Sequence, residues 1–250
     1  MTRQGALLRA VVAGSVGLLP ATRTKNRLLR LLGHRVHRTA RVSPILLLGV
    51  ERLVLGPGAV IGAGTTFRNL RRIELHTGAV IGGWNSISAS PLYRTPGVSA
   101  DEDVAGAIVL GEGAFITNRH YLDCSGGLIL GRWAGMGGVH TVVLSHSIDL
   151  GDYTTWCGTV RFEDHSFVAT ATRILAGSTL PARSVLAAGA VLLPGLTEPD
   201  AMYGGVPARM IRKDVSNGRW FVRAGDIDLH RGLPSATPPD EGGTGTLGAN

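Results

Sequence analysis

Apolar residues return at every sixth position along residues 162–192. They are Phe162, Val168, Ile174, Leu180, Leu186 and Leu192. An amphipathic helix would repeat at three and four residues, and a half-buried strand at two. A period of six contains the strand period and leaves room for a turn. Each unit is therefore predicted to be one short strand followed by one corner.

Small residues recur in phase with this column, four places after each of its first five members. They are Ser166, Thr172, Ser178, Ser184 and Ala190. Three strand-and-corner units make one coil of a parallel β-helix, whose stacked coils bury the apolar column and pair each backbone with its neighbours. The pattern therefore predicts an all-β solenoid.

The same period covers residues 55–142 in two sets that share one irregularity, an eight-residue step. The sets are Leu55, Ile61, Phe67, Leu75, Ile81 and Ile87, then Leu110, Ile116, Leu122, Leu130, Met136 and Val142. The recurrence predicts a coil of about 20 residues, so that residues 20 apart lie about 4.8 Å apart on adjacent coils. This register places Glu163, Asp164 and Ser166 beside His146, and stacks His120 on His140.

The period fails in two places, and these divide the chain. We expect a β-helix over residues 51–196, with excursions near 89–106 and 143–159, where repeat scaffolds commonly carry specificity. Residues 197–232 are expected to close the solenoid and to include a short C-terminal helix. Residues 233–250, rich in Gly, Pro, Ser and Thr, are expected to be disordered.

The N-terminal region, residues 1–50, alternates apolar and arginine-rich patches. It is predicted to form a basic amphipathic helical cap, broken near Pro20, that covers the open end of the solenoid. A second interpretation is peripheral contact of residues 1–38 with an anionic membrane surface. No apolar run reaches the roughly 20 residues of a spanning helix.

The charge of +7 and the pI near 10.2 indicate an anionic partner. Nucleic acid is the general interpretation of this charge, and a phosphorylated cofactor is the more specific one. Cys124 and Cys157 have neither metal-binding spacing nor a disulfide framework. They predict reduced thiols in a cytoplasmic protein, membrane-associated if the basic region contacts lipid.

The hexads, joined to the ending YGGVPARMIRK at Tyr203–Lys213, resemble the hexapeptide-repeat acyltransferases. That family includes galactoside, maltose and xenobiotic acetyltransferases and acetyltransferases of polysaccharide biosynthesis. The resemblance covers residues 53–213. It implies a left-handed parallel β-helix, a homotrimer with active sites between subunits, and acetyl-CoA as the acyl donor. Left-handed crossovers depart from the usual rule, so the handedness comes from the resemblance.

The resemblance also points to His146 as the catalytic base, because the family carries its catalytic histidine in the corresponding excursion. The chemistry supports this residue type. An acceptor hydroxyl must lose a proton while it attacks a thioester, and neutral imidazole, with a pKa of about 6.5, suits that step near pH 7. Asp149, three residues further on, is the first choice to orient the ring.

The remaining candidate site residues are assigned by the same resemblance. Thr170, Gly177 and Ala188 are expected to line the pantetheine arm, Pro207 and Ala208 to close over it, and Arg209 and Arg212 to bind its phosphates. Asn118, His120 and Asp123 are expected to bind the acceptor.

We therefore expect an O-acetyltransferase that acts in a ternary complex on a hydroxyl of a sugar or glycan precursor, with no metal. N-acetylation of an amino sugar or nucleotide sugar, or of an antibiotic, is an alternative. A zinc enzyme like the gamma-class carbonic anhydrases would use His120, His140 and either His146 or His165. A scaffold without catalysis is the alternative outside enzymology.

Overall fold

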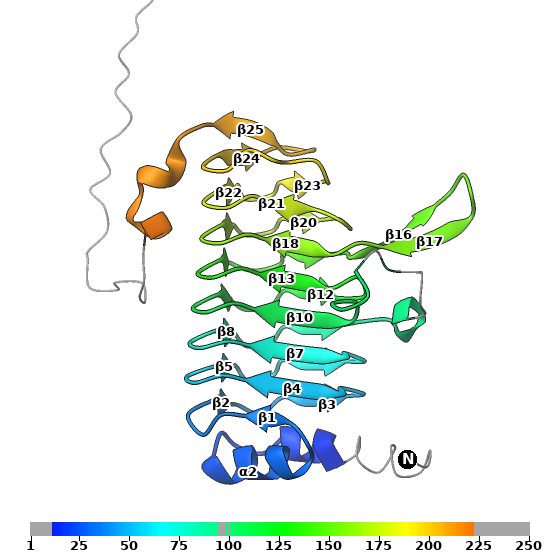
Figure 1. Cartoon of the computed structure of the whole chain (residues 1–250), viewed down its shortest axis with the longest axis vertical. Helices are drawn as coiled ribbons and strands as arrows, with labels where there is room; N and C mark the ends of the chain where they lie inside the picture. The colour runs from blue at the N-terminus through cyan, green and yellow to red at the C-terminus, as the bar shows by residue number, and fades with distance from the viewer. Residues whose placement is uncertain (1–11, 95–98, 100, 223–250) are drawn as a thin grey trace, which may run out of the picture.

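A computed structural model describes residues 12–94, 99 and 101–222 of the 250-residue chain. Short strands stack in coils from an N-terminal helical cap to the C-terminal end (Figure 1). The strands form three long sheets, and every pair within them is parallel except the last pair of the second sheet. The predicted left-handed parallel β-helix is confirmed.

Each coil contributes one strand to each of the three sheets. The first sheet contains β1 (Arg35–Val36), β4 (Arg52–Leu55), β7 (Arg72–Leu75), β10 (Ala107–Leu110), β13 (Leu128–Leu130), β18 (Val160–Phe162) and β21 (Thr179–Leu180). The second contains β2 (Arg41–Val42), β5 (Val60–Ile61), β8 (Val80–Ile81), β11 (Phe115–Ile116), β14 (Gly135–Met136), β19 (Phe167–Val168), β22 (Val185–Leu186), β24 (Met202–Gly204) and β25 (Arg209–Arg212). The third contains β3 (Leu46–Leu48), β6 (Thr66–Arg68), β9 (Ser86–Ser88), β12 (Tyr121–Asp123), β15 (Val142–Val143), β20 (Arg173–Ile174) and β23 (Val191–Leu192).

The six-residue column forms the core. Phe162 is 1% exposed, and Val168, Ile174, Leu180, Leu186 and Leu192 are fully buried. The small corner residues are buried as well, and the three serines among them donate to backbone carbonyls, as Ser166 Oγ does to the oxygen of Glu163 at 2.7 Å. The period thus predicts burial correctly because alternate residues of each short strand face the axis.

The number of residues per coil varies. Ile108 pairs with Leu128 at the predicted spacing of 20, but Tyr121 pairs with Val142 and Arg161 with Thr179, which are 21 and 18 apart. His120 therefore lies beside Thr141, whose backbone N–H donates to its ring, and the predicted stacking on His140 is wrong.

The predicted adjacency of Glu163, Asp164 and Ser166 to His146 is also wrong. The Glu163 amide bonds to Leu180 on the next coil, and Asp164 accepts a hydrogen bond from the Arg132 amide at 2.8 Å. The reason is that His146 begins an inserted hairpin, so that residues after it no longer follow the register of the coils.

The β-helix begins at Arg35 and not at residue 51, because β1, β2 and β3 pair with β4, β5 and β6. Residues 12–17 and α2 (Arg23–Leu31) form the helical cap below this first coil. Lys25 is fully buried and donates from Nζ to the carbonyls of Gly17 and Ser43, both at 2.7 Å. No described helix has the length and hydropathy needed to cross a membrane.

The solenoid continues beyond residue 196. β24 extends the second sheet by pairing with β22, and β25 folds back on it in antiparallel orientation. Among the described residues of this end, up to Val222, the structure has two short 3-10 helices, η2 (Val215–Asn217) and η3 (Arg219–Val222). The Trp220 ring of η3 packs edge-on against Phe167, 4.8 Å between centroids. The predicted disordered tail, 233–250, lies outside the described residues.

Two departures from the coils lie along the same edge of the molecule (Figure 1). The first includes η1 (Pro91–Arg94), and the second is an antiparallel hairpin of β16 (His146–Asp149) and β17 (Thr154–Cys157). Both begin where a strand of the third sheet ends. They bring residues that are distant in sequence to the corner between the third and first sheets.

Candidate active site

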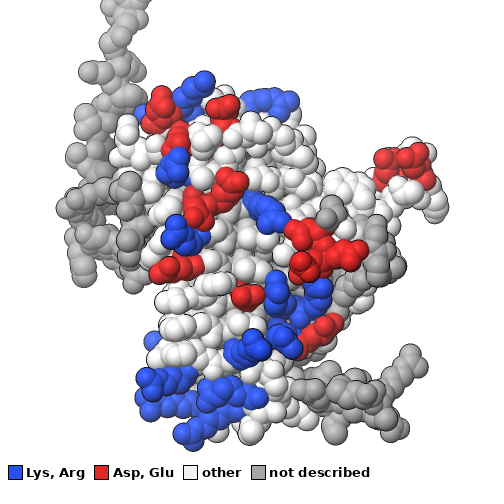
Figure 2. Space-filling model, viewed as in Figure 1, with Lys and Arg blue, Asp and Glu red and all other residues white. Residues whose placement is uncertain are grey.

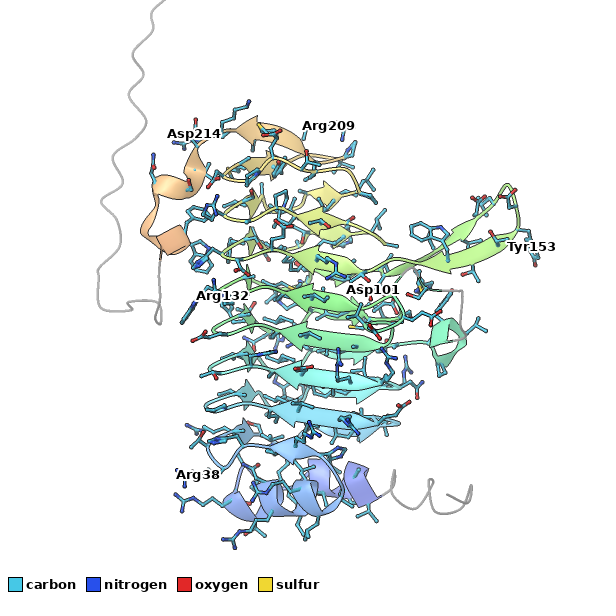
Figure 3. All side chains as sticks on the ribbon, in the orientation of Figure 1. Arg38, Asp101, Arg132, Tyr153, Arg209 and Asp214 are labelled. Carbon is cyan, nitrogen blue, oxygen red and sulfur yellow. The ribbon has the colours of Figure 1, made fainter. Side chains whose placement is uncertain are left out.

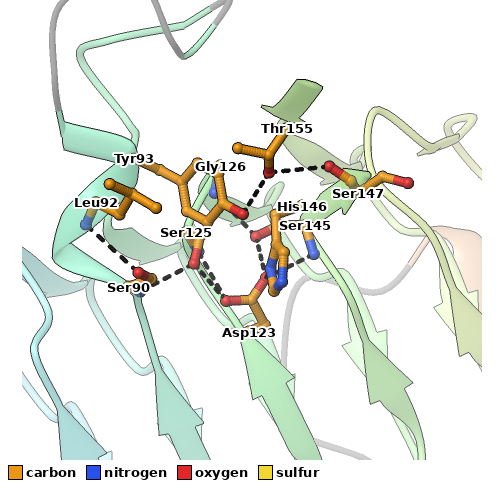
Figure 4. Close-up of polar contacts among 10 residues, drawn as sticks. All are labelled: Ser90, Leu92, Tyr93, Asp123, Ser125, Gly126, Ser145, His146, Ser147 and Thr155. Atoms are coloured by element: carbon orange, nitrogen blue, oxygen red, sulfur yellow. Dashed lines mark hydrogen bonds and ion pairs between the residues drawn. The ribbon is translucent and has the colours of Figure 1, made fainter. Parts of the chain in front are cut away.

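A buried carboxylate and a histidine meet at this corner. Asp123 ends β12 and His146 begins β16, and the distance between His146 Nδ1 and Asp123 Oδ2 is 2.8 Å (Figure 4). The Asp123 side chain is 8% exposed, whereas that of His146 is 38% exposed. The pair thus presents its imidazole outward from a buried support.

Two serines complete the surroundings of Asp123. Oδ1 accepts from Ser125 Oγ at 2.6 Å and from the Ser125 amide, and Oδ2 accepts from Ser145 Oγ at 2.8 Å and from the Ser145 amide. Each hydroxyl itself accepts from a backbone amide, Ser125 from Ser90 and Ser145 from Gly126. Both hydroxyl protons therefore point toward the carboxylate, which acts only as an acceptor.

This network sets the tautomer of His146. Because Asp123 only accepts, Nδ1 carries the proton, and the lone pair of the neutral ring is on Nε2. The Tyr93 ring lies over the imidazole, with the centroids 5.1 Å apart. Tyr93 Oη is 2.6 Å from Thr155 Oγ1, which donates to the Ser147 carbonyl. The two excursions thus hold the imidazole in place together.

A cavity of about 360 Å³ opens at His146. Its lining includes Arg68, Ser88, Ser90, Tyr121, Asp123 and His146. Among the described lining residues, Arg68 supplies the only guanidinium. The cavity is polar and large enough for a sugar-sized ligand.

Asp149 does not orient His146, so this prediction is wrong. It lies at the far end of β16, opposite Thr154, and its Oδ1 accepts from the amides of Gly151 at 2.8 Å and Asp152 at 3.2 Å. Three residues of extended chain separate the two side chains by about 10 Å. Asp149 stabilises the hairpin turn. Asp123 orients the His146 ring, which is the role that was expected of Asp149.

The three residues predicted to bind the acceptor lie at two different corners of the solenoid. Asp123 lies in the cavity, but Asn118 and His120 lie at the corner between the second and third sheets. Asn118 Oδ1 accepts from the Gly83 amide at 2.6 Å. Asn118 and His120 therefore stabilise a corner and do not line the cavity.

Both nitrogens of His120 are engaged within that corner. Nδ1 accepts from the Thr141 amide at 3.1 Å, and Nε2 lies 3.0 Å from Thr117 Oγ1. Burial, with a smaller contribution from the charge of His140, lowers the pKa of His120 to about 4. The described residues contain no group of three or more His, Cys, Asp or Glu placed to hold a metal ion. The engaged nitrogens of His120 argue against the zinc interpretation.

The predicted cofactor residues lie along two different edges of the third sheet. Gly177 follows β20 on the same edge as His146, and a Cβ at Gly177 would lie 3.9 Å from the Trp156 ring of the hairpin. Thr170 and Ala188 lie on the opposite edge, before β20 and β23. Within one chain the structure thus brings Gly177, but not Thr170 or Ala188, to the His146 corner.

The segment with Pro207 and Ala208 closes the C-terminal end. The Val191 amide of β23 donates to the Gly205 carbonyl at 3.0 Å, and the Val191 carbonyl accepts from the Ala208 amide at 2.8 Å. Ala208 is buried in this contact, while Arg209 and Arg212 are exposed on β25, where Figure 3 shows Arg209 at the end of the solenoid.

The chain matches no protein-family model and no curated protein. It is similar to solved structures. The polysialic acid O-acetyltransferase OatWY aligns at a TM-score of 0.51 and 13% identity, over 80% of this chain and 90% of that one. A hexapeptide-repeat acetyltransferase from Vibrio cholerae, complexed with acetyl-CoA, aligns at 0.43 and 18%, over 84% and 87%. The N-acyltransferase AntD from Bacillus cereus, in complex with dTDP and coenzyme A, aligns at 0.48 and 15%, over 61% and 82%. The predicted resemblance to hexapeptide-repeat acetyltransferases is thus confirmed at the level of the fold.

Proposed function

We propose that this protein is an acetyl-CoA-dependent O-acetyltransferase whose acceptor is a hydroxyl of a sugar or glycan precursor. The observation that carries the proposal is the Asp123–His146 pair at the edge of a polar cavity. The solenoid shared with OatWY, a sugar O-acetyltransferase, supports the same class of reaction.

His146 acts as the general base. Its Nε2 accepts the proton of the acceptor hydroxyl while the hydroxyl oxygen forms a bond to the carbonyl carbon of the acetyl thioester. The carbon–sulfur bond then breaks, and the imidazolium returns the proton to the leaving sulfur. Asp123 holds the ring in the reactive tautomer and stabilises the positive charge between these two steps.

The donor is expected to lie along a strip of glycines that begins at the Asp123 network. A Cβ on Gly126 would lie 2.7 Å from the Gly158 carbonyl oxygen, and one on Gly158 would lie 2.7 Å from the Gly177 nitrogen. Successive coils therefore touch here through bare backbone. Trp156 lies beside Gly158 and Gly177 of this strip. Without side chains in the way, the extended pantetheine arm of acetyl-CoA can reach the backbone here.

Thr170, Ala188, Pro207, Arg209 and Arg212 keep their proposed roles in donor binding within a homotrimer. Because Thr170 and Ala188 are on the edge of the third sheet away from His146, they would serve the site of a neighbouring copy. The exposed hairpin supports such an assembly, since Ile148 and Leu150 are 63% and 88% exposed on it.

The lining of the cavity favours an acidic sugar over a neutral one. Arg68 is exposed on β6, and none of the ion pairs among the described residues includes it. A carboxylate or phosphate on the acceptor would form a charge-assisted bond with it. An amine acceptor would use the same base, and no contact in the cavity favours it.

The test is acetyl-CoA turnover against a panel of neutral sugars, acidic sugars, amino sugars, nucleotide sugars and chloramphenicol. His146→Ala is expected to lower kcat by at least about 10²-fold with the best acceptor, because the base is lost. Asp149→Asn is the matched control and should keep activity within about twofold. Unchanged turnover in His146→Ala would show that His146 is not the base. Turnover of amine acceptors alone would show that the protein is an N-acetyltransferase.

A further inference from the structure

A second hollow, of about 640 Å³, lies at the N-terminal end of the solenoid. Five arginines line it: Arg23, Arg27, Arg30, Arg38 and Arg41. Among its described lining residues there is no Asp or Glu, and Figure 2 shows basic side chains gathered at this end of the molecule. The hollow is therefore strongly positively charged, and it lies far from the His146 cavity along the axis of the solenoid.

The positive charges of the arginines on α2 destabilise this helix. Arg23, Arg27 and Arg30 are spaced by four and three residues, so their side chains share one face of α2. Like charges at this spacing repel each other. The first turn of α2 contains no acidic residue and begins with Arg23, although the N-terminus of a helix favours negative charge.

Buried contacts hold this helix in place despite the repulsion. Asn26 is 4% exposed and donates from Nδ2 to the Ala40 carbonyl at 2.8 Å. Lys25 bonds to three carbonyls, and Leu29 is fully buried. The opposite wall is fixed at Thr39, whose Oγ1 accepts from the Gly58 amide at 2.9 Å. The arginines thus face one another from two anchored elements.

Carboxylates of the described residues also do not neutralise these arginines. Arg30 donates to the Val36 carbonyl at 2.9 Å, but no ion pair in the described part of the chain joins any of the five to a carboxylate. Some exposed arginines elsewhere on the solenoid are paired, as Arg183 is with Asp200 and Arg132 with Asp164. Five arginines without a carboxylate partner around one hollow indicate a ligand that supplies negative charge.

We propose that this hollow binds a ligand bearing phosphate groups, with a diphosphate as the best match. Guanidinium groups bind phosphate oxygens through paired, charge-assisted hydrogen bonds, and two linked phosphates neutralise more of the five charges than one carboxylate does. The site is independent of acetyl transfer. The ligand has two sources, a phospholipid headgroup and a soluble diphosphate, and the first would account for the membrane contact expected of residues 1–38.

The full chain is titrated calorimetrically with inorganic pyrophosphate and sedimented with vesicles of phosphatidylcholine, with and without phosphatidylglycerol. The test variant is Arg27→Gln with Arg38→Gln. The matched control, Arg52→Gln with Arg119→Gln, removes the same charge from exposed positions outside the hollow. The test pair should weaken binding at least about tenfold, and the control pair by less than about twofold.

Saturable binding of pyrophosphate that depends on the hollow supports a soluble diphosphate source. Binding to phosphatidylglycerol vesicles alone, with the same dependence, supports the lipid source. The proposal is overturned if wild type binds neither probe, or if both double variants weaken binding equally, because net charge alone then explains the interaction. If the test pair melts early by circular dichroism, Arg23→Gln with Arg41→Gln replaces it.

Discussion

Asp123 is the residue on which the candidate site depends. It has five hydrogen-bond donors within 3.2 Å, including His146 Nδ1, and its side chain is 8% exposed. A buried carboxylate with every acceptor position used is rigid, and a rigid partner keeps the imidazole in one orientation. Its contribution to catalysis therefore acts through His146.

Asp123→Asn should lower kcat by about 10²- to 10⁴-fold and change the KM values little. The amide keeps the shape of the side chain but presents a donor on one side, which favours the wrong tautomer of His146. Steady-state kinetics across pH checks this, with Asp149→Asn alongside. Equal losses in both variants would assign the effect to the hairpin and not to the tautomer.

Arg68→Ala should raise the KM for an acidic sugar by about tenfold and leave the KM for a neutral sugar unchanged, because only the acidic acceptor pairs with the guanidinium. Arg68→Lys should restore part of the difference. Initial rates with a matched pair of acceptors, one with a carboxylate and one without, measure it. The same KM change for both acceptors would count against charge recognition.

At the scale of elements, the corner that contains His120 links fold stability to pH. Its pKa of about 4 in the folded chain lies below the unfolded value of 6.5. Above pH 6.5 the ring is neutral in both states. As the pH falls from 6.5 to 4, the unfolded state binds the proton first, so stability decreases over that range.

We expect the free energy of unfolding to fall by about 2 to 3 kcal/mol between pH 7 and pH 4.5 through His120 alone. Urea unfolding of wild type and His120→Gln at both pH values isolates this contribution. The variant should lose that part of the pH dependence, even if it is less stable at pH 7. Identical pH slopes in the two proteins would show that His120 contributes nothing.

The hairpin makes a separate prediction for donor binding. Trp156→Ala should raise the KM for acetyl-CoA by about tenfold, because its ring lies beside Gly158 and Gly177 of the glycine strip proposed to bind the donor. Tyr153→Ala is the control, since Tyr153 is 94% exposed on the same hairpin. An unchanged KM for acetyl-CoA in Trp156→Ala would show that the donor does not bind along the glycine strip.

At the scale of the whole molecule, the proposed site needs more than one chain. Light scattering after size exclusion should give three times the chain mass of 26.2 kDa. His146→Ala and Ala188→Trp should each be inactive alone, but mixed trimers formed by co-expression should recover activity, because a site is then built from one intact edge of each chain. A monomer, or mixed trimers without activity, would contradict shared sites.

Sequence alone determined the solenoid, because the six-residue period is a local property of a short strand and its corner. It also pointed to His146, because the family that the chain resembles carries its catalytic histidine in this excursion. For the orienting carboxylate it favoured Asp149, and it assigned Asp123 to the acceptor. Asp149 is close in sequence, but the extended hairpin carries it away, whereas coil stacking brings Asp123 to the ring from 23 residues earlier.

The tertiary structure likewise decided which of the other candidate residues lie in the cavity. Asn118 and His120 precede Asp123 by only a few residues, yet a strand of the third sheet places them on its opposite edge. Coils of 18 to 21 residues shift the register between neighbours, which no fixed period predicts. Local periodicity therefore determined the fold, and the lengths of corners and insertions, visible only in three dimensions, decided which side chains meet.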